Sequence, residues 1–404
     1  MKKFFKLFNP NIEEGVRLIS IATSIRWFGW GFAEAFLPIF LFSFAHTYAE
    51  TGLLRSIYGV VFLLSLPMVS WLADNIASKK LLIVSLLLYP FISISYFSAG
   101  VFGVIAFIVC ARIINGVAYA LDGVGRATYV RTHAKPENIA TSFGYMDSLA
   151  NFWWLVAIFI SAILVRYIPI HYLFLMIAPT SLIAIYFVRK LPDGLTASSL
   201  TKEARLSVFG SYGSFFKTII SWGRNVRWLA VFYLFIDITA TVGEFFIPIY
   251  AFTQHQSLWQ IVLLTGFAAF PALFSSPLGL IADKYKHTIF WTCGFLTVFL
   301  FLLAFIPIFP AQLVLVFLIG SCLQLLGLSV DREITLAVPK EHIGTLSGAF
   351  EGVSQVAEIT GPIVLGIMID LSSMRITLSV LAVISIIFAV IYFNFNKKNE
   401  QNKI

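Results

Sequence analysis

The chain has 404 residues, of which 59% are hydrophobic and 12% are charged, and its formal net charge is +8. An average soluble domain has about 45–50% apolar and about 25% charged residues, so this composition excludes an ordinary soluble domain and predicts an integral membrane protein. The basic residues lie between hydrophobic stretches and form no soluble basic face, which argues against a nucleic-acid partner.

Twelve runs of the sequence are long and apolar enough to cross a bilayer, whose hydrocarbon core of about 30 Å needs about 20 residues of helix. In chain order, the predicted spans are 16–43, 53–73, 80–98, 101–122, 140–165, 171–189, 228–252, 258–281, 288–308, 311–331, 345–369 and 375–395. The predicted fold class is therefore an all-α integral membrane protein with 12 transmembrane helices in two six-helix bundles.

The polar stretch 190–227 is the long interruption between these spans. We interpret it as a cytoplasmic central linker, with an amphipathic piece at 209–222, between an N-terminal bundle (1–189) and a C-terminal bundle (228–404). Lys and Arg gather in the loops on the side of the N-terminus, so we expect both termini in the cytoplasm and the chain in the cell inner (plasma) membrane. The N-terminus lacks the pattern of a cleaved signal peptide.

The two halves of the chain match each other. "AEAFLPIFLF" (33–42) and "GEFFIPIYAF" (243–252) each place an acid four residues before a proline, and "WLADNIASKK" (71–80) corresponds to "LIADKYKHTI" (280–289). Two further pairs follow in the same order, Asp122 with Asp331 and Asp147 with Glu351. Four matches in one order predict two pseudo-symmetric halves in parallel repeat, a common plan of transporters.

Six plus six helices, a basic central linker and an Asp-plus-basic loop after the second helix of each half resemble the major facilitator superfamily. In that family the loop reads approximately G-x-L-A-D-R-x-G-R-[KR]; here it is "SWLADNIASKK" and "GLIADKYKHT". "RIING" (112–116) resembles an R-x-x-x-G of helix four in proton-coupled multidrug exporters of the family. The exporters' G-x-x-x-G-P-x-x-G pattern of helix five is replaced by "NFWWLVAIFISAIL", and "GPIVLG" appears in helix eleven instead. The resemblance implies transport by alternating access.

Charged residues inside predicted spans are costly, so they are candidates for function. Asp237 and Glu244 are seven residues apart, as are Glu351 and Glu358, which predicts that each pair shares one helix face. The residues expected to couple protons or contact substrate are Glu34, Asp147, Asp237, Glu244, Glu351, Glu358, Arg26 and Arg112. Aromatic and polar residues expected to line the cavity are Trp30, Asn115, Asn151, Trp154 and Gln355.

A second group of charged residues falls at the predicted cytoplasmic ends of helices. A carboxylate there can cap a helix or pair with basic loop residues, and so latch one conformational state. The expected cytoplasmic gate consists of Asp74, Lys79, Asp122, Arg126, Asp283, Lys284, Asp331 and Arg332. The alternative is that these are interfacial ion pairs with topological value only.

Acids that bind either a proton or a cation provide the simplest scheme for antiport. We therefore expect a secondary active transporter, with proton-coupled export of organic cations or amphipathic compounds. Proton-coupled uptake of a sugar or other small nutrient, export of a divalent metal, a lipid flippase and a non-transporting receptor stay open as alternatives. The expected partners are a small-molecule substrate, protons and the lipid bilayer, and we expect a monomer without cofactor or bound metal. The sequence shows no nucleophile–base pair and no phosphate-binding loop, so we do not expect an enzyme.

Overall fold

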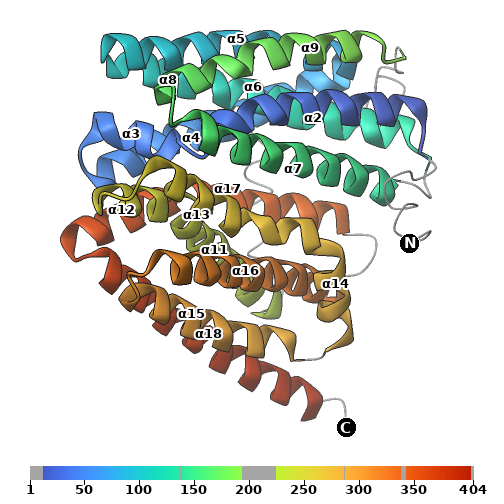
Figure 1. Ribbon diagram of the computed structural model, residues 1–404. Coiled ribbons are helices and arrows are strands. Elements are labelled where there is room, and N and C mark those ends of the chain that lie inside the picture. Colours follow the sequence, from blue (N-terminus) through green and yellow to red (C-terminus); the bar gives the residue numbers. More distant parts are fainter. Residues whose placement is uncertain (1–11, 136–138, 193–223, 286, 338–342, 402–404) are drawn as a thin grey trace, which may run out of the picture. The chain divides into compact units, whose positions relative to one another are not determined.

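The computed structural model describes residues 12–135, 139–192, 224–285, 287–337 and 343–401 (Figure 1). The described residues are helical or lie in short connections, and none of them is in a strand. The chain forms two compact units, one of residues 1–44 and 57–213 and the other of residues 45–56 and 214–404. Most of the predicted linker lies outside the described residues. The sequence did not predict that 45–56 would join the second unit.

The first unit contains the helices of the N-terminal half. They are α2 (Glu14–Glu34), α3 (Leu37–Ala45), most of α4 (Tyr48–Asn75), α5 (Ser78–Phe102), α6 (Ile105–His133), α7 (Ile139–Leu164), α8 (Ile170–Leu173), the 3-10 helix η2 (Phe174–Met176) and α9 (Ile177–Arg189). Within this unit α2 packs against α7 and α9, and α5 packs against α6 and α9.

The second unit contains the helices of the C-terminal half. They are α11 (Arg224–Thr241), the π-helix η5 (Val242–Phe246), α12 (Ile247–Thr253), α13 (Leu258–Ala269), the 3-10 helix η6 (Phe270–Phe274), α14 (Ser275–Lys284), α15 (Thr288–Phe305), α16 (Phe309–Ala337), α17 (Ile343–Leu371) and α18 (Met374–Gln401). Here α15 packs against α16 and α18, and α11 packs against α16 and α17.

Each of the 12 predicted spans coincides with helix. Among the described residues, ten helical segments are long and apolar enough to cross a membrane unaided, and α2 with α3 forms an eleventh span that is bent by 43°. The remaining prediction, 258–281, falls on α13, η6 and α14, of which Leu258–Phe274 is a shorter apolar helix. The all-α prediction is confirmed.

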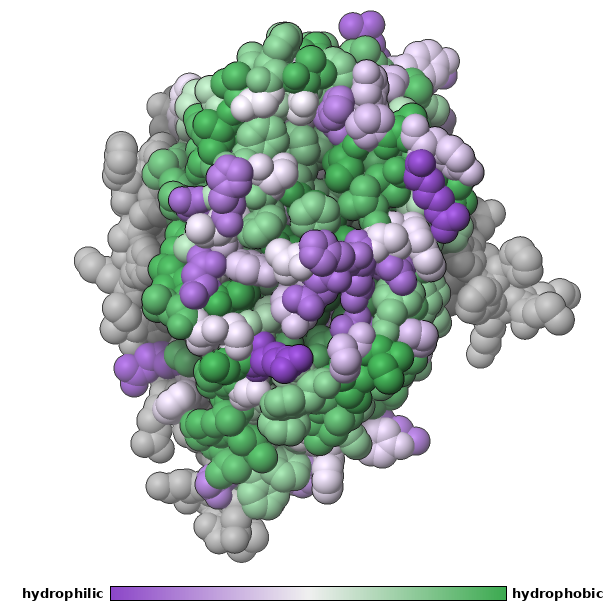
Figure 2. Space-filling view, turned by 60° about the vertical axis from the view of Figure 1, so that its left-hand side comes forward, coloured by the Kyte–Doolittle hydropathy of each residue, from purple (hydrophilic) through white to green (hydrophobic). Residues whose placement is uncertain are grey.

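The helices turn apolar side chains outward as well as inward. On α5, Leu87, Phe91 and Ile94 follow one stripe and are 47%, 59% and 55% exposed, whereas Tyr89 and Tyr96 on another face are buried. Figure 2 shows hydrophobic side chains over much of the face in view, interrupted by hydrophilic patches. Such a surface suits lipid rather than water. Cys293 and Cys322 are buried, whereas Cys110 is exposed.

The acid–proline motif interrupts the helix in both halves. In the first half α2 ends at Glu34, and Pro38 follows at the start of α3. In the second half Glu244 lies in the π-helix, and Pro248 follows in α12. Proline has no N–H to donate to the carbonyl four residues earlier, which in both cases belongs to the acid. The repeat therefore places Glu34 and Glu244 at irregular backbone.

A tight seam joins the first turns of α4 to α17 within the second unit. The carboxylate of Asp370 accepts hydrogen bonds from the Tyr48 N–H at 3.1 Å and the Ala49 N–H at 2.8 Å, which caps α4. The Ser56 hydroxyl donates to the Ile359 carbonyl at 2.7 Å.

Two glycines let the backbones of the seam approach closely. A side chain at Gly52 would meet the Pro362 carbonyl, and one at Gly366 would meet the backbone of Tyr48. The seam thus consists of Tyr48, Ala49, Gly52 and Ser56 on α4 with Ile359, Pro362, Gly366 and Asp370 on α17.

We expect Asp370→Ala to lower the free energy of unfolding by about 0.5–2 kcal/mol, the usual cost of losing a helix cap. The reason is that two amides at the start of α4 lose their acceptor. Thermal melting of the purified protein measures this change. Glu50→Ala, which removes an exposed acid from the same helix start, is the control and should leave the melting temperature nearly unchanged. Equal shifts for the two variants would contradict the capping role.

Candidate functional site

A buried ionic cluster occupies the first unit. Asp122 Oδ2 lies 3.0 Å from Arg26 Nη2 and 2.8 Å from Arg126 Nε, and Arg26 Nη1 donates to the Tyr89 hydroxyl at 3.0 Å. The Asp122 side chain is only 4% exposed. One carboxylate thus serves two guanidinium groups, away from water.

This cluster combines residues that the sequence assigned to different groups. Arg26 was predicted in the cavity, whereas Asp122 and Arg126 were predicted at the cytoplasmic gate. Tyr89 was not predicted at all, because it lies in a mostly apolar run without a charged residue. The i, i+4 spacing did indicate the pair Asp122–Arg126.

Arg112 and Asn115 are also buried, at 2% and 4% exposure, one turn apart on α6. The guanidinium carbon of Arg112 lies 5.0 Å from the centre of the Tyr58 ring, a cation–π distance. A buried guanidinium in a membrane span is costly, which is why Arg112 was a candidate for function.

Glu34 contacts an aromatic group at the junction of α2 and α7. The Trp154 indole N–H donates to Glu34 Oε2 at 2.8 Å, and the Trp27 and Trp154 rings meet edge to face at 6.3 Å. Trp30, between Arg26 and Glu34 on α2, meets Tyr89 edge to face at 6.5 Å. A half-buried carboxylate among indole rings can attract an organic cation.

Two further predicted residues lie on α7 before Trp154. Asn151 is half-buried, one turn before Trp154, and Asp147 is exposed.

In the second unit, Asp237 lies on α11 and Glu358 lies on the neighbouring helix α17. A Cβ at Gly361 of α17 would lie 3.4 Å from Thr241 Oγ1 and from the Ile238 side chain of α11, which sets the register. Asp237 lies one turn before Thr241 on α11, and Glu358 lies one turn before Gly361 on α17. Both are half-buried.

Gln355 lies one turn before Glu358 on α17 and is 6% exposed. Glu244 lies within the π-helix η5, which has more residues per turn than an α-helix, and its side chain is exposed, whereas that of Asp237 is half-buried. The side chain of Glu351 lies outside the described part of the structure.

The predicted gate residues make several separate contacts. Lys79 Nζ donates to the Leu191 carbonyl at 2.8 Å, and Lys284 Nζ lies 5.4 Å from the Tyr285 ring centre. Arg332 pairs with its neighbour Glu333 at 3.1 Å, so the second half has a local pair where the first half has the buried cluster. Asp331 is exposed. The side chains of Asp74 and Asp283 are outside the described part.

Membrane-spanning helices in two units, each with polar groups buried between helices, define a multi-pass membrane transporter. The family model of the Major Facilitator Superfamily matches residues 19–350 and 258–404, and the chain belongs to this family. Membership indicates a transporter of small molecules embedded in a membrane and not an enzyme. No curated protein matches the sequence.

Several solved structures share the fold. The nucleoside transporter NupG is 14% identical, with a TM-score of 0.73 over 95% of this chain and 100% of that one. A POT family transporter in complex with 5-aminolevulinic acid is 13% identical, with a TM-score of 0.76 over 95% and 96%. The human organic anion transporter MFSD10 (TETRAN) is 15% identical, with a TM-score of 0.63 over 93% and 98%. These similarities support the fold alone.

Proposed function

We propose that this protein is a proton-coupled secondary transporter that exports organic cations or amphipathic compounds by alternating access. The observation that carries the proposal is the Glu34 carboxylate held by Trp154 with Trp27 beside it. A proton and an organic cation would compete for this carboxylate, and such competition couples their movements in opposite directions. Asp237 and Glu358 supply further acids for the same purpose in the second unit.

The proposed arrangement places the protein in the inner (plasma) membrane as a monomer with both termini in the cytoplasm. In this orientation the Lys79 contact with Leu191 and the loops after the second helix of each half are on the cytoplasmic side. We propose that these loops form the cytoplasmic gate. The ion pair between Arg332 and Glu333 is the proposed counterpart of this gate in the second half.

Proton-coupled uptake of a small nutrient is the second candidate. The fold is compatible with such cargo, because structures that share it include a nucleoside transporter and a POT family transporter in complex with 5-aminolevulinic acid. Buried amides at Asn115 and Gln355 are suitable hydrogen-bonding partners for a polar neutral substrate.

The test uses the full chain in proteoliposomes with an imposed pH gradient and tetraphenylphosphonium as the probe. The wild-type protein should move the cation in the direction opposite to proton flow, and Glu34→Gln should lose most of that movement. Glu50→Gln makes the same chemical change at an exposed acid and should keep it. Cation transport that does not depend on the pH gradient would refute the proposal, as would a wild-type rate of cation transport in Glu34→Gln. Gradient-driven uptake of uridine without cation movement would favour the second candidate.

A further inference from the structure

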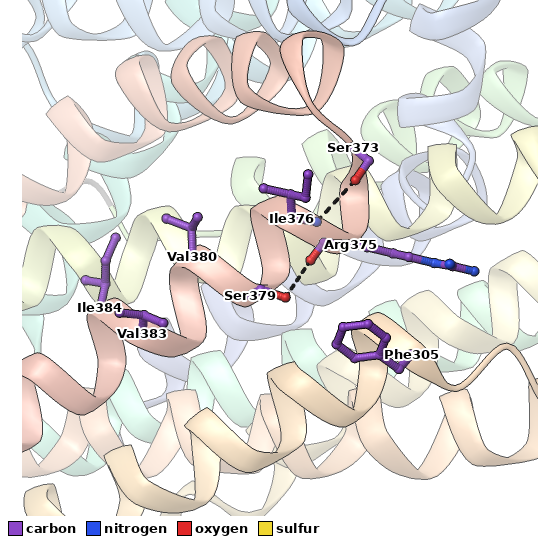
Figure 3. Close-up of a pocket in the computed structure, with 8 residues that line it drawn as sticks. All are labelled: Phe305, Ser373, Arg375, Ile376, Ser379, Val380, Val383 and Ile384. Atoms are coloured by element: carbon purple, nitrogen blue, oxygen red, sulfur yellow. Dashed lines mark hydrogen bonds between the residues drawn. The ribbon is translucent and has the colours of Figure 1, made fainter.

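A groove on the second unit lies between the end of α15 and the first turns of α18 (Figure 3). Its volume of about 490 Å³ falls within the roughly 300–1,000 Å³ of small-molecule sites. It is lined by other helices than those that carry Glu34, Asp237 and Glu358. The transport proposal therefore leaves this groove unexplained.

One wall of the groove is a continuous apolar stripe. Ile376, Val380, Val383 and Ile384 follow one face of α18, and Phe305 at the end of α15 forms the opposite side. Ile376, Val383 and Phe305 are 52%, 56% and 55% exposed. The stripe is about 12 Å long at about 1.5 Å per helical residue. This shape and chemistry match a hydrocarbon chain lying along α18.

The mouth of the groove carries an uncompensated positive charge. Arg375 lies in the first turn of α18 and is exposed, and within the described part of the structure its side chain makes no ion pair or hydrogen bond. In Figure 3 its guanidinium extends away from the helix. A cation in the first turn opposes the helix dipole, so the charge does not stabilise the helix.

The hydroxyl groups at the mouth differ in what they can offer a ligand. Ser379 already donates to the Arg375 carbonyl at 2.8 Å. Ser373 accepts the Ile376 N–H at 3.2 Å, so its own O–H remains available as a donor. Arg375 and Ser373 together present donors suited to a phosphate oxygen.

We propose that this groove binds an anionic phospholipid, with the phosphate at Arg375 and Ser373 and one acyl chain along Ile376 to Ile384. The mouth lies where the last predicted span begins, at the depth of lipid headgroups, and the apolar stripe runs from there into the span. Phosphatidylglycerol is preferred over phosphatidylcholine because the choline lipid carries its own ammonium group and so does not neutralise Arg375.

The test measures lipid retained by the full chain in native mass spectrometry. The detergent-purified protein is titrated with phosphatidylglycerol or phosphatidylcholine of identical acyl chains. Wild type should retain one phosphatidylglycerol several-fold more often than phosphatidylcholine. Arg375→Gln should lose this preference, Arg375→Lys should keep much of it, and Val380→Trp should lower retention of both lipids by filling the groove.

The matched control is Arg166→Gln, which removes an exposed arginine just beyond the end of α7 in the first unit. It should keep the wild-type preference. Equal retention of both lipids by wild type would overturn the proposal, as would an unchanged preference in Arg375→Gln. Arg375 is exposed, so its replacement leaves the packed interior intact and loss of folding does not confuse the result.

Discussion

Asp122→Asn should lower the free energy of unfolding by about 3–5 kcal/mol, the cost of breaking a buried ion pair from one side. The substitution keeps the shape of the side chain and removes its charge. Arg26 and Arg126 then remain together in the interior without the carboxylate that now lies 3.0 Å and 2.8 Å from them. Thermal and denaturant unfolding of the detergent-purified protein measures the loss.

Two companion variants separate charge from packing in this prediction. Glu14→Gln makes the same carboxylate-to-amide change at an exposed acid of the same unit, at the start of α2, and should shift the melting temperature little. Arg126→Met leaves one cation for one anion, so it should cost less than Asp122→Asn. If Arg126→Met were the more damaging change, the account based on excess positive charge would be wrong.

Gly366→Ala should destabilise the protein by about 1–3 kcal/mol, the usual cost of overpacking. The new Cβ would meet the backbone of Tyr48 and Ala49, so α4 and α17 would have to separate. Gly294→Ala is the matched control, because nothing lies within 4 Å of its added Cβ and it is also in a helix of the second unit.

The two glycine variants should change the melting temperature in opposite directions. Alanine is favoured over glycine inside a helix by about 0.5–1 kcal/mol, so Gly294→Ala should raise the melting temperature while Gly366→Ala lowers it. Parallel unfolding curves of the two proteins check this contrast. Stabilisation by Gly366→Ala would show that the backbones of the seam are not in close contact.

The sequence predicted the spans well because membrane helices are marked by the length of their apolar runs. The acid–proline motif, which the sequence analysis used only to match the two halves, also marks where the first and seventh spans are irregular, since proline leaves the carbonyl of the acid without its usual donor. It did not distinguish a bend after Glu34 from a π-helix around Glu244. That difference depends on packing within each half.

Long-range partners in the candidate site were harder to predict. Nothing in the spacing connects Arg26 with Asp122, because the two residues are brought together only by the packing of α2 and α6. Asp370 lies in a stretch whose composition is typical of a loop, close to serines and Arg375. Nothing in the neighbouring sequence indicates that its carboxylate caps the start of α4. The i, i+4 spacing indicated the ion pair between Asp122 and Arg126, and the structure shows that Arg26 also pairs with Asp122.

The seam between α4 and α17 has a consequence for synthesis of the chain. Ser56 and its acceptor Ile359 are 303 residues apart, so the start of α4 leaves the ribosome long before its partners exist. Domains generally fold from the N-terminus during synthesis, but the N-terminal unit can be complete while residues 45–56 still lack Gly366 and Asp370. The second unit, in turn, finishes folding around a segment made in the first sixth of translation.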